Sequence, residues 1–133
     1  MKVKKVIIHA DGASRGNPGP AAIGATIEGE AGQRLASISQ RIGRATNNQA
    51  EYRALIVALK EAIKLGTSEA DIYLDSELVV RQVNGKYRVK NTALKPLYQE
   101  VKRLQGLLRG SVVSHIPRQQ NTEADTLANA ALE

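Results

Sequence analysis

Four acidic residues occupy positions where folding could bring their carboxylates together. Asp11 follows the apolar run "VIIHA", and Asp75 follows "ADIYL". Short apolar runs of this kind are typical of buried strands. Because ligands collect at the carboxyl ends of strands in open α/β sheets, we expect Asp11 and Asp75 to share one sheet edge. Glu51 and Asp125 each lie about one turn into a segment with a helical pattern. This spacing allows convergence without proving it.

Each acid taken alone has a simpler explanation. Helix N-termini favour acids, and aspartate is common in turns. Four converging carboxylates, in contrast, would repel one another and would need cations or shifted protonation. Oxygen ligands in a chain without cysteine suit hard cations such as Mg²⁺ or Mn²⁺. Two such ions can support phosphodiester hydrolysis.

The order of the predicted elements indicates one α/β domain over residues 1–133, with a five-stranded mixed sheet flanked by helices. The first strand begins at Val3 and ends at Asp11, and the next two form a hairpin that turns near residues 29–32. The first helix is predicted within residues 46–66, where Thr46 caps its N-terminus and Gly66 ends it. The remaining segments are a strand at 70–76, helices at 76–85 and 91–110, a strand at 111–117 and a helix at 121–133.

Composition limits the class of partner. The formal charge is +6 with a pI near 9.8, which favours a polyanion such as nucleic acid. Phe and Trp are absent, so the core should be aliphatic. No stretch approaches the roughly 20 apolar residues of a membrane span, and the N-terminal apolar run is too short for a secretion signal. We therefore expect a cytoplasmic monomer without a membrane or an obligate protein partner.

Four motifs in order, "DGASRGNPGPAAIG", "TNNQAEYRAL", "YLDSELVV" and "NTEADTLA", resemble those of ribonuclease H type 1. The resemblance implies the ribonuclease H-like fold and cleavage of the RNA strand of RNA–DNA hybrids, leaving 5′-phosphate and 3′-hydroxyl ends. It implies an acidic tetrad of Asp11, Glu51, Asp75 and Asp125 that binds two Mg²⁺ ions, with Mn²⁺ as a substitute. Asp11 would contact both ions, Glu51 would also orient the RNA 2′-hydroxyl, and Asp75 would bind the ion that activates water.

The same resemblance predicts two groups of substrate contacts. The Gly/Pro-rich loop would approach the minor groove, where 2′-hydroxyls distinguish RNA from DNA; its candidates are Gly12, Ser14, Arg15 and Asn17. A tight turn between strands would explain the same glycines. The second group would hold a DNA phosphate and read bases in the groove, and its members are Thr46, Asn47, Asn48 and Asn91. Without the resemblance, the three residues of "TNN" are read as helix caps.

The sequence departs from many relatives after the second helix. The segment "RQVNGKYRVKNTALKPL" is too short for the family's basic protrusion and contains no Trp. We expect Lys86, Tyr87, Arg88 and Lys90 to take over contact with the substrate. We expect no separate hybrid-binding domain.

An accessory catalytic residue is the main ambiguity. His115 lies ten residues before Asp125, a spacing found in some relatives, but "VVSHIPR" places it inside a strand. Arg118 follows the predicted turn at Pro117, and we favour it as the residue near the acids. His115 is then a structural strand residue. His9, two residues before Asp11, should share its strand face as a packed, hydrogen-bonded neighbour.

Two other functions remain open on the same fold. One is an inactive nucleic-acid-binding module, which should have lost at least one acid, although all four are present. The other is a nuclease that acts on DNA junctions. The "DGASRGNPGPAAIG" loop argues against it, because the loop resembles the part that senses ribose.

Overall fold

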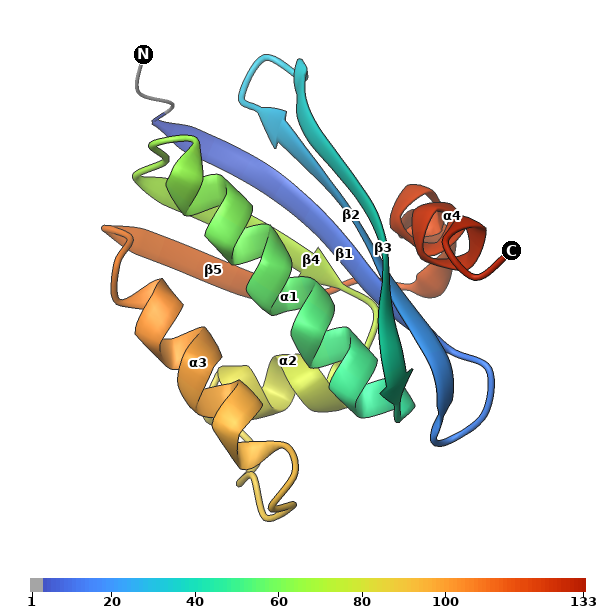
Figure 1. Ribbon diagram of the computed structural model, residues 1–133. Helices are drawn as coiled ribbons and strands as arrows, with labels where there is room; N and C mark the ends of the chain where they lie inside the picture. Colours follow the sequence, from blue (N-terminus) through green and yellow to red (C-terminus); the bar gives the residue numbers. More distant parts are fainter. Residues whose placement is uncertain (1–3) are drawn as a thin grey trace.

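The computed structural model describes residues 4–133 as a five-stranded mixed sheet with four α-helices (Figure 1). Val3, which we predicted to begin the first strand, lies outside the described residues. In chain order the elements are β1 (Lys5–Ser14), β2 (Gly19–Gly29), β3 (Arg34–Ala45), α1 (Asn47–Lys64), β4 (Glu69–Leu74), α2 (Glu77–Val83), α3 (Lys95–Gln105), β5 (Gly110–His115), the 3₁₀ turn η1 (Arg118–Gln120) and α4 (Thr122–Ala130).

The sheet has the strand order β3-β2-β1-β4-β5. β1, β2 and β3 form an antiparallel meander, whereas β4 and β5 run parallel to β1. The predicted turn near residues 29–32 is confirmed, since the Gly29 N–H donates to the Gln33 carbonyl oxygen. The expectation of a mixed sheet flanked by helices is therefore confirmed.

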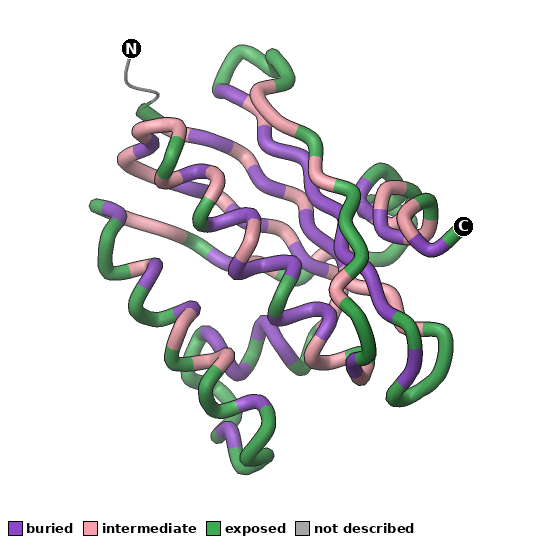
Figure 2. Tube along the Cα trace, in the orientation of Figure 1, coloured by how far each residue is buried: buried purple, intermediate pink, exposed green. Residues whose placement is uncertain are grey.

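Helices cover both faces of the sheet. α1 packs over β1 and β2 with α3 beside it, and α4 lies on the opposite face against β1, β2 and β3 (Figure 1). Figure 2 shows the central strands and the inner face of α1 as buried. The core between them is aliphatic, as predicted, and includes Ile8, Leu55, Leu59 and Ile72. Tyr52 is the buried aromatic exception, and its hydroxyl donates to Gln82 Oε1 at 2.7 Å.

The start of α1 is fixed by a complete capping box. Thr46 Oγ1 accepts from the Gln49 N–H, and the Gln49 side chain accepts from the Thr46 N–H. At the other end Gly66 adopts a φ of 82°, which a residue without a side chain adopts without strain. Both helix ends that we predicted are confirmed.

Two glycines allow helices to approach the sheet closely. A side chain at Gly12 would collide with the α1 backbone, where Glu51 N would lie only 2.5 Å from its Cβ. A side chain at Gly24 would likewise meet α4, with Ala128 N at 2.5 Å. These close approaches bring α1 and α4 against the sheet on either side of Asp11.

Several predicted boundaries are wrong. β1 continues to Ser14 instead of ending at Asp11, because its last residues pair with Ala21 and Ala22 of β2. The Gly/Pro-rich loop is therefore short and covers residues 15–18. The third helix covers Lys95–Gln105 and not 91–110, and the last helix ends at Ala130 and not at 133. Within residues 4–133, no helix has both the length and the apolar character required to cross a bilayer.

Candidate active site

Asp11, Glu51 and Asp75 form a compact carboxylate cluster. One oxygen from each of them lies within 4.8 Å of the others. Asp11 comes from within β1, Asp75 directly follows β4, and Glu51 is the fifth residue of α1. The three acids come from distant parts of the chain, and the parallel pairing of β1 with β4 brings two of them to the same edge. The predicted convergence of these three side chains is confirmed.

Glu51 is held in a fixed orientation. The Gly12 N–H donates to Glu51 Oε1 at 2.9 Å, so the close approach of α1 to β1 also aims this carboxylate. Its second oxygen, Oε2, is buried and has no hydrogen-bond partner among the described residues. A buried carboxylate oxygen without a donor is costly, and a cation beside it would satisfy it.

Burial and the repulsion between neighbouring carboxylates raise the pKa values of Asp11 and Glu51. Burial raises the pKa of Asp11 well above its usual range, and the neighbouring carboxylates of Glu51, Asp75 and Asp125 raise it further. The pKa of Glu51 is also raised, chiefly by burial, although the hydrogen bond from Gly12 opposes the shift. Without cations the site favours the protonated form of at least one acid, as expected for a metal-binding cluster.

Asp125 stands beside this cluster but outside the 4.8 Å group. It lies in the first turn of α4, and its carboxylate is near enough to raise the pKa of Asp11. The Asn129 side chain, one turn later, donates to Asp125 Oδ1 at 3.1 Å and to the Asp125 carbonyl oxygen at 3.0 Å. Three of the four predicted acids therefore meet directly, and the fourth approaches from the opposite face of the sheet.

Arg118 and His115, the two candidates for the accessory catalytic residue, lie in different elements. Arg118 is exposed in η1, and its positive charge lowers the pKa of Glu51. It therefore lies within electrostatic reach of the acids. His115 is the last residue of β5, paired with Leu74, and its side chain is exposed. The description of His115 as a strand residue is right, but the side chain is not packed in the interior.

His9 is packed but not hydrogen-bonded. Its ring stacks on Tyr73 with centroids 5.2 Å apart, and burial lowers its pKa. In residues 4–133 no hydrogen bond to the His9 ring is found, so that half of the prediction is wrong. The ring of His9, two residues before Asp11 in β1, thus packs against Tyr73 of β4.

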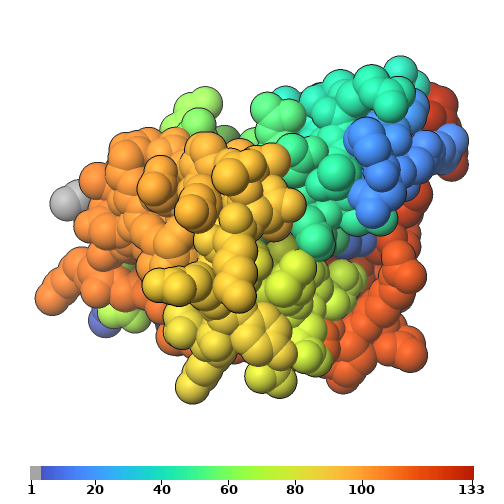
Figure 3. Space-filling model, turned by 90° about the horizontal axis from the view of Figure 1, so that it is seen from below, coloured from blue at the N-terminus to red at the C-terminus, as the bar shows by residue number. Residues whose placement is uncertain are grey.

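A polar cavity of about 200 Å³ collects residues predicted to hold the DNA strand. Figure 3 shows the segment leading into α3 lying against the start of α1 on this face. The Asn91 Oδ1 accepts from the N–H groups of Ala93 and Leu94, which leaves its NH₂ group for a ligand. The cavity is lined by Asn17, Thr46, Asn48, Gln49, Asn91, Ala93 and Leu94. Asn47, predicted with them, is exposed and does not line it.

The β1–β2 loop is tied down by its own polar groups. Asn17 Oδ1 accepts from the Asn47 N–H at 3.0 Å, and Ser14 Oγ donates to the Ala45 carbonyl oxygen at 2.8 Å. Arg15 has an exposed side chain, while its N–H donates to the Pro20 carbonyl oxygen. The loop is thus a tight turn, as the alternative explanation required, and it still presents Arg15 and Asn17 at the surface.

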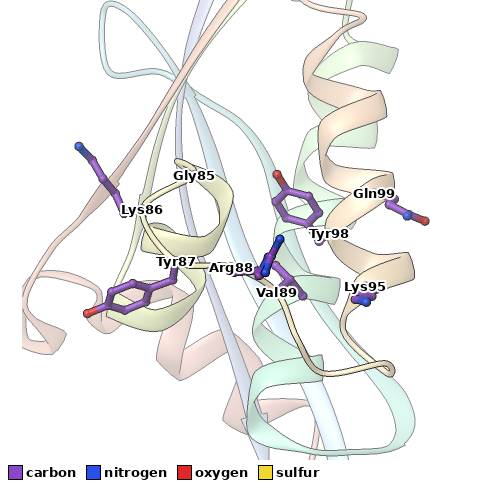
Figure 4. A pocket seen from close by; sticks show the side chains of 8 residues that line it. All are labelled: Gly85, Lys86, Tyr87, Arg88, Val89, Lys95, Tyr98 and Gln99. Atoms are coloured by element: carbon purple, nitrogen blue, oxygen red, sulfur yellow. The ribbon is translucent and has the colours of Figure 1, made fainter.

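The segment that replaces the protrusion lines a larger pocket of about 660 Å³ (Figure 4). Arg88 and Val89 face Tyr98 across it, whereas Lys86 and Tyr87 lie on the side away from α3. Arg81 stacks over the Tyr87 ring at 5.3 Å. Lys90, predicted with this group, does not line the pocket.

Sequence reasoning missed several residues of these sites. Lys95, Tyr98 and Gln99 from α3 complete the large pocket. Gln49 lines the polar cavity as well as closing the capping box. The side chain of Asn121 donates to Asp75 Oδ2 at 3.1 Å. The one available signal for Asn121 was its place four residues before Asp125, which reads equally well as a helix cap.

Comparison with known proteins identifies the family. A family model described as "Reverse transcriptase-like" matches residues 9–131. The ribonuclease HI of Halobacterium salinarum is 42% identical over 95% of this chain and 64% of its own length. A protein named ribonuclease H from Ruthia magnifica is 30% identical over 98% of this chain and 97% of its own length. The chain belongs to the ribonuclease H family.

Solved structures agree with this ribonuclease H assignment and with type 1. The N-terminal RNase H domain of rv2228c from Mycobacterium tuberculosis is 48% identical with a TM-score of 0.94, and the match covers 97% of this chain and 99% of that one. LC11-RNase H1, solved in complex with an RNA/DNA hybrid, is 43% identical with a TM-score of 0.90 over 95% of both chains. The chain spans 36% of the length of the mycobacterial relatives that it matches.

Proposed function

We propose that this chain is an endonuclease that hydrolyses the RNA strand of RNA–DNA hybrids, leaving 5′-phosphate and 3′-hydroxyl ends. The observation that carries the proposal is the cluster of Asp11, Glu51 and Asp75, whose oxygens lie within 4.8 Å of one another. Membership of the ribonuclease H family supports it. An inactive binding module would not need to keep these acids together at the cost of their repulsion.

Mg²⁺ is the proposed metal, as a pair of ions, with Mn²⁺ as a substitute. The donor set fits hard cations, because it consists of carboxylate oxygens and includes the unpartnered Glu51 Oε2. Asp11, Glu51 and Asp75 would hold the ions, and Asp125 would complete the set. When bound, such ions polarise the scissile phosphate and lower the pKa of water.

Other residues of the chain would position the metal-binding carboxylates and stabilise charge on the phosphate. The Gly12 N–H fixes Glu51, and the amide of Asn129 fixes Asp125. The exposed guanidinium of Arg118 is the accessory group, where its permanent charge would stabilise negative charge that develops on the phosphate. We propose no proton transfer for Arg118, because its guanidinium stays charged.

An RNA–DNA hybrid is the proposed partner. LC11-RNase H1 was solved with such a hybrid, which supports the same partner here. We assign the DNA-strand phosphate to the polar cavity that Thr46, Asn48 and Asn91 line, beside the N-terminus of α1, where helices attract anions. Asn17, which we predicted to contact the RNA strand, also lines this cavity. Arg15 would face the RNA strand, and Lys86 and Arg88 would attract the backbone. A cytoplasmic location and a monomeric state stay predictions.

The deciding experiment compares duplexes of one sequence. RNA–DNA, RNA–RNA and DNA–DNA duplexes and a four-way DNA junction are incubated with the protein, with and without Mg²⁺. We expect cleavage of the RNA strand of the hybrid alone, and only with metal. Hybrid binding without cleavage would establish the inactive module, and preferential cutting of the junction would establish the DNA nuclease.

A further inference from the structure

Asn121 lies at the centre of the elements that carry the acids. It directly precedes α4, its exposed fraction is 1%, and its side chain reaches back to the sheet. The amide nitrogen Nδ2 donates to the Ala10 carbonyl oxygen at 2.9 Å and to Asp75 Oδ2 at 3.1 Å. Because both partners are acceptors, chemistry fixes the orientation of the amide, with Oδ1 turned away from them.

The Asn121 side chain does not cap the helix that it precedes. Asn121 occupies the N-cap of α4, where asparagine commonly accepts a hydrogen bond from the first helical turn. Here the side chain makes no capping hydrogen bond. Its Oδ1 is buried without a partner among the described residues. Helix capping therefore does not explain this buried side chain, and its unsatisfied oxygen is a cost to the fold.

The hydrogen bonds of Asn121 reach three elements that carry acids, but only the one to Asp75 involves an acidic side chain. Ala10 directly precedes Asp11, so the first hydrogen bond anchors β1 beside that carboxylate. The second orients Asp75 itself. The Asn121 backbone carbonyl accepts from the Asp125 N–H at 3.1 Å, which begins the helix that carries Asp125. One buried residue thus connects β1, the end of β4 and α4.

We propose that Asn121 is a positioning residue, whose amide holds Asp75 and the end of β1 in the arrangement that binds divalent cations. This inference rests on the proposed function only in taking the acid cluster as the metal site. A neutral donor on Asp75 Oδ2 restricts the orientation of the carboxylate without removing its charge. Groups that orient metal ligands in this way typically change metal affinity about 10–100-fold when they are removed.

The test measures metal binding apart from catalysis. Asn121→Ala removes both donors, and Asn121→Ser keeps a short hydroxyl that cannot bridge both acceptors. Asn84→Ala is the matched control, because the Asn84 amide also donates to a backbone carbonyl, that of Val113 at 2.9 Å, away from the acids. Isothermal titration with Mn²⁺ alone gives the affinity, and hybrid cleavage at increasing Mg²⁺ gives the activation midpoint. Thermal midpoints are recorded in chelator.

We expect the Mn²⁺ affinity of Asn121→Ala to fall, and its Mg²⁺ activation midpoint to rise, about 10–100-fold. Excess Mg²⁺ should restore part of the turnover, and the KM for hybrid should stay unchanged. Asn84→Ala should match the wild type in metal affinity. If Asn121→Ala does not fold, Asn121→Ser at reduced temperature gives the same comparison with a smaller shift.

Wild-type metal affinity in folded Asn121 variants that have only a lower thermal midpoint would overturn the inference, because the residue would then be structural. Failure of the proposed function would give a different result, in the wild-type protein and not in the Asn121 variants. In that case the wild-type protein itself binds Mn²⁺ no more tightly than Asp11→Asn does, and cleaves no hybrid.

Discussion

Asp11 and Asp75 occupy equivalent positions directly after the last paired residues of the neighbouring parallel strands β1 and β4. The pairing of β1 with β4 ends at Ala10 and Leu74, and each aspartate is the next residue. β1 itself continues to Ser14 through its other neighbour, β2. The end of the parallel pairing, and not the end of the strand, therefore places the two carboxylates side by side.

Asp11→Asn and Asp75→Asn should each abolish cleavage while the fold is retained. An amide keeps the shape of the side chain but removes the charge that a divalent cation requires. Turnover on an RNA–DNA hybrid at saturating Mg²⁺ is the measurement, with circular dichroism as the check on folding. Activity above a few per cent of wild type in both variants would remove these acids from the metal site.

Asp11→Asn should also change the dependence of stability on pH. The pKa of Asp11 is raised in the folded, metal-free protein. At pH values above about 4, the pKa of an unfolded aspartate, the folded state therefore keeps a proton that the unfolded chain has released. The free energy of unfolding therefore falls as pH rises through that window. The amide variant does not titrate, so its stability lacks this decrease.

Thermal midpoints in chelator at pH 4 and pH 7.5 test this relation. We expect Asp11→Asn to gain about 1 kcal/mol over wild type at pH 7.5, about 3–5 °C for a chain of this size, and little at pH 4. Asp71→Asn is the control, because its carboxylate pairs with Lys5 at 3.2 Å outside the cluster. An equal gain in thermal midpoint at pH 4 and pH 7.5 would show that the gain does not arise from the raised pKa of Asp11.

Changing Lys86, Arg88 and Lys95 together to alanine should weaken hybrid binding. These cations line the large pocket, and Lys86 and Arg88 belong to the segment that replaces the protrusion. The slope of log affinity against log salt should become shallower by roughly 0.7–0.9 for each phosphate that the variant no longer neutralises. Turnover at saturating substrate should stay near wild type.

The matched control for the salt series changes Lys4, Lys64 and Arg109 to alanine. This triple variant removes the same charge from exposed positions outside the described pockets. Its salt slope should equal that of the wild type. Equal slopes in both triple variants would mean that the pocket does not bind the nucleic-acid backbone.

Arg118→Ala should lower turnover, with a rise in activation free energy of about 1.5–3 kcal/mol, the usual size of a hydrogen bond to a charged group. The charge of Arg118 acts on Glu51, whereas His115 is exposed at the end of β5. His115→Ala should leave the thermal midpoint almost unchanged, since exposed substitutions usually stay within about 0.5 kcal/mol. Both variants are assayed on one hybrid at saturating Mg²⁺. A decrease in turnover confined to His115→Ala would make the histidine the accessory group.

Gly12→Ala should reduce stability and activity together. The added methyl group would collide with the backbone of Ala50 and Glu51, and overpacking of this kind costs about 1–3 kcal/mol. Gly32→Ala is the control, because nothing lies within 4 Å of a side chain there, although its φ of 86° adds local strain. Unchanged turnover in a fully stable Gly12→Ala would show that α1 does not need this approach to aim Glu51.

The order of the elements, the aliphatic core and the family can all be predicted from the amino-acid sequence, because they depend on local patterns and on motif order. The periodicity of the first helix, its cap at Thr46 and its end at Gly66 are all found in the structure. Apolar spacing and capping act over a few residues, so a single chain reveals them.

Which acids meet, and which groups hold them, depends on contacts between distant parts of the folded chain. Register between β1 and β4 places Asp11 beside Asp75, and the close approach of Gly12 to α1 aims Glu51. Asn121 reads as an ordinary helix cap in the sequence, yet its amide crosses to β1 and Asp75. Such hydrogen bonds join residues as many as 111 positions apart. Their geometry depends on how helices pack on the sheet, which no local pattern encodes.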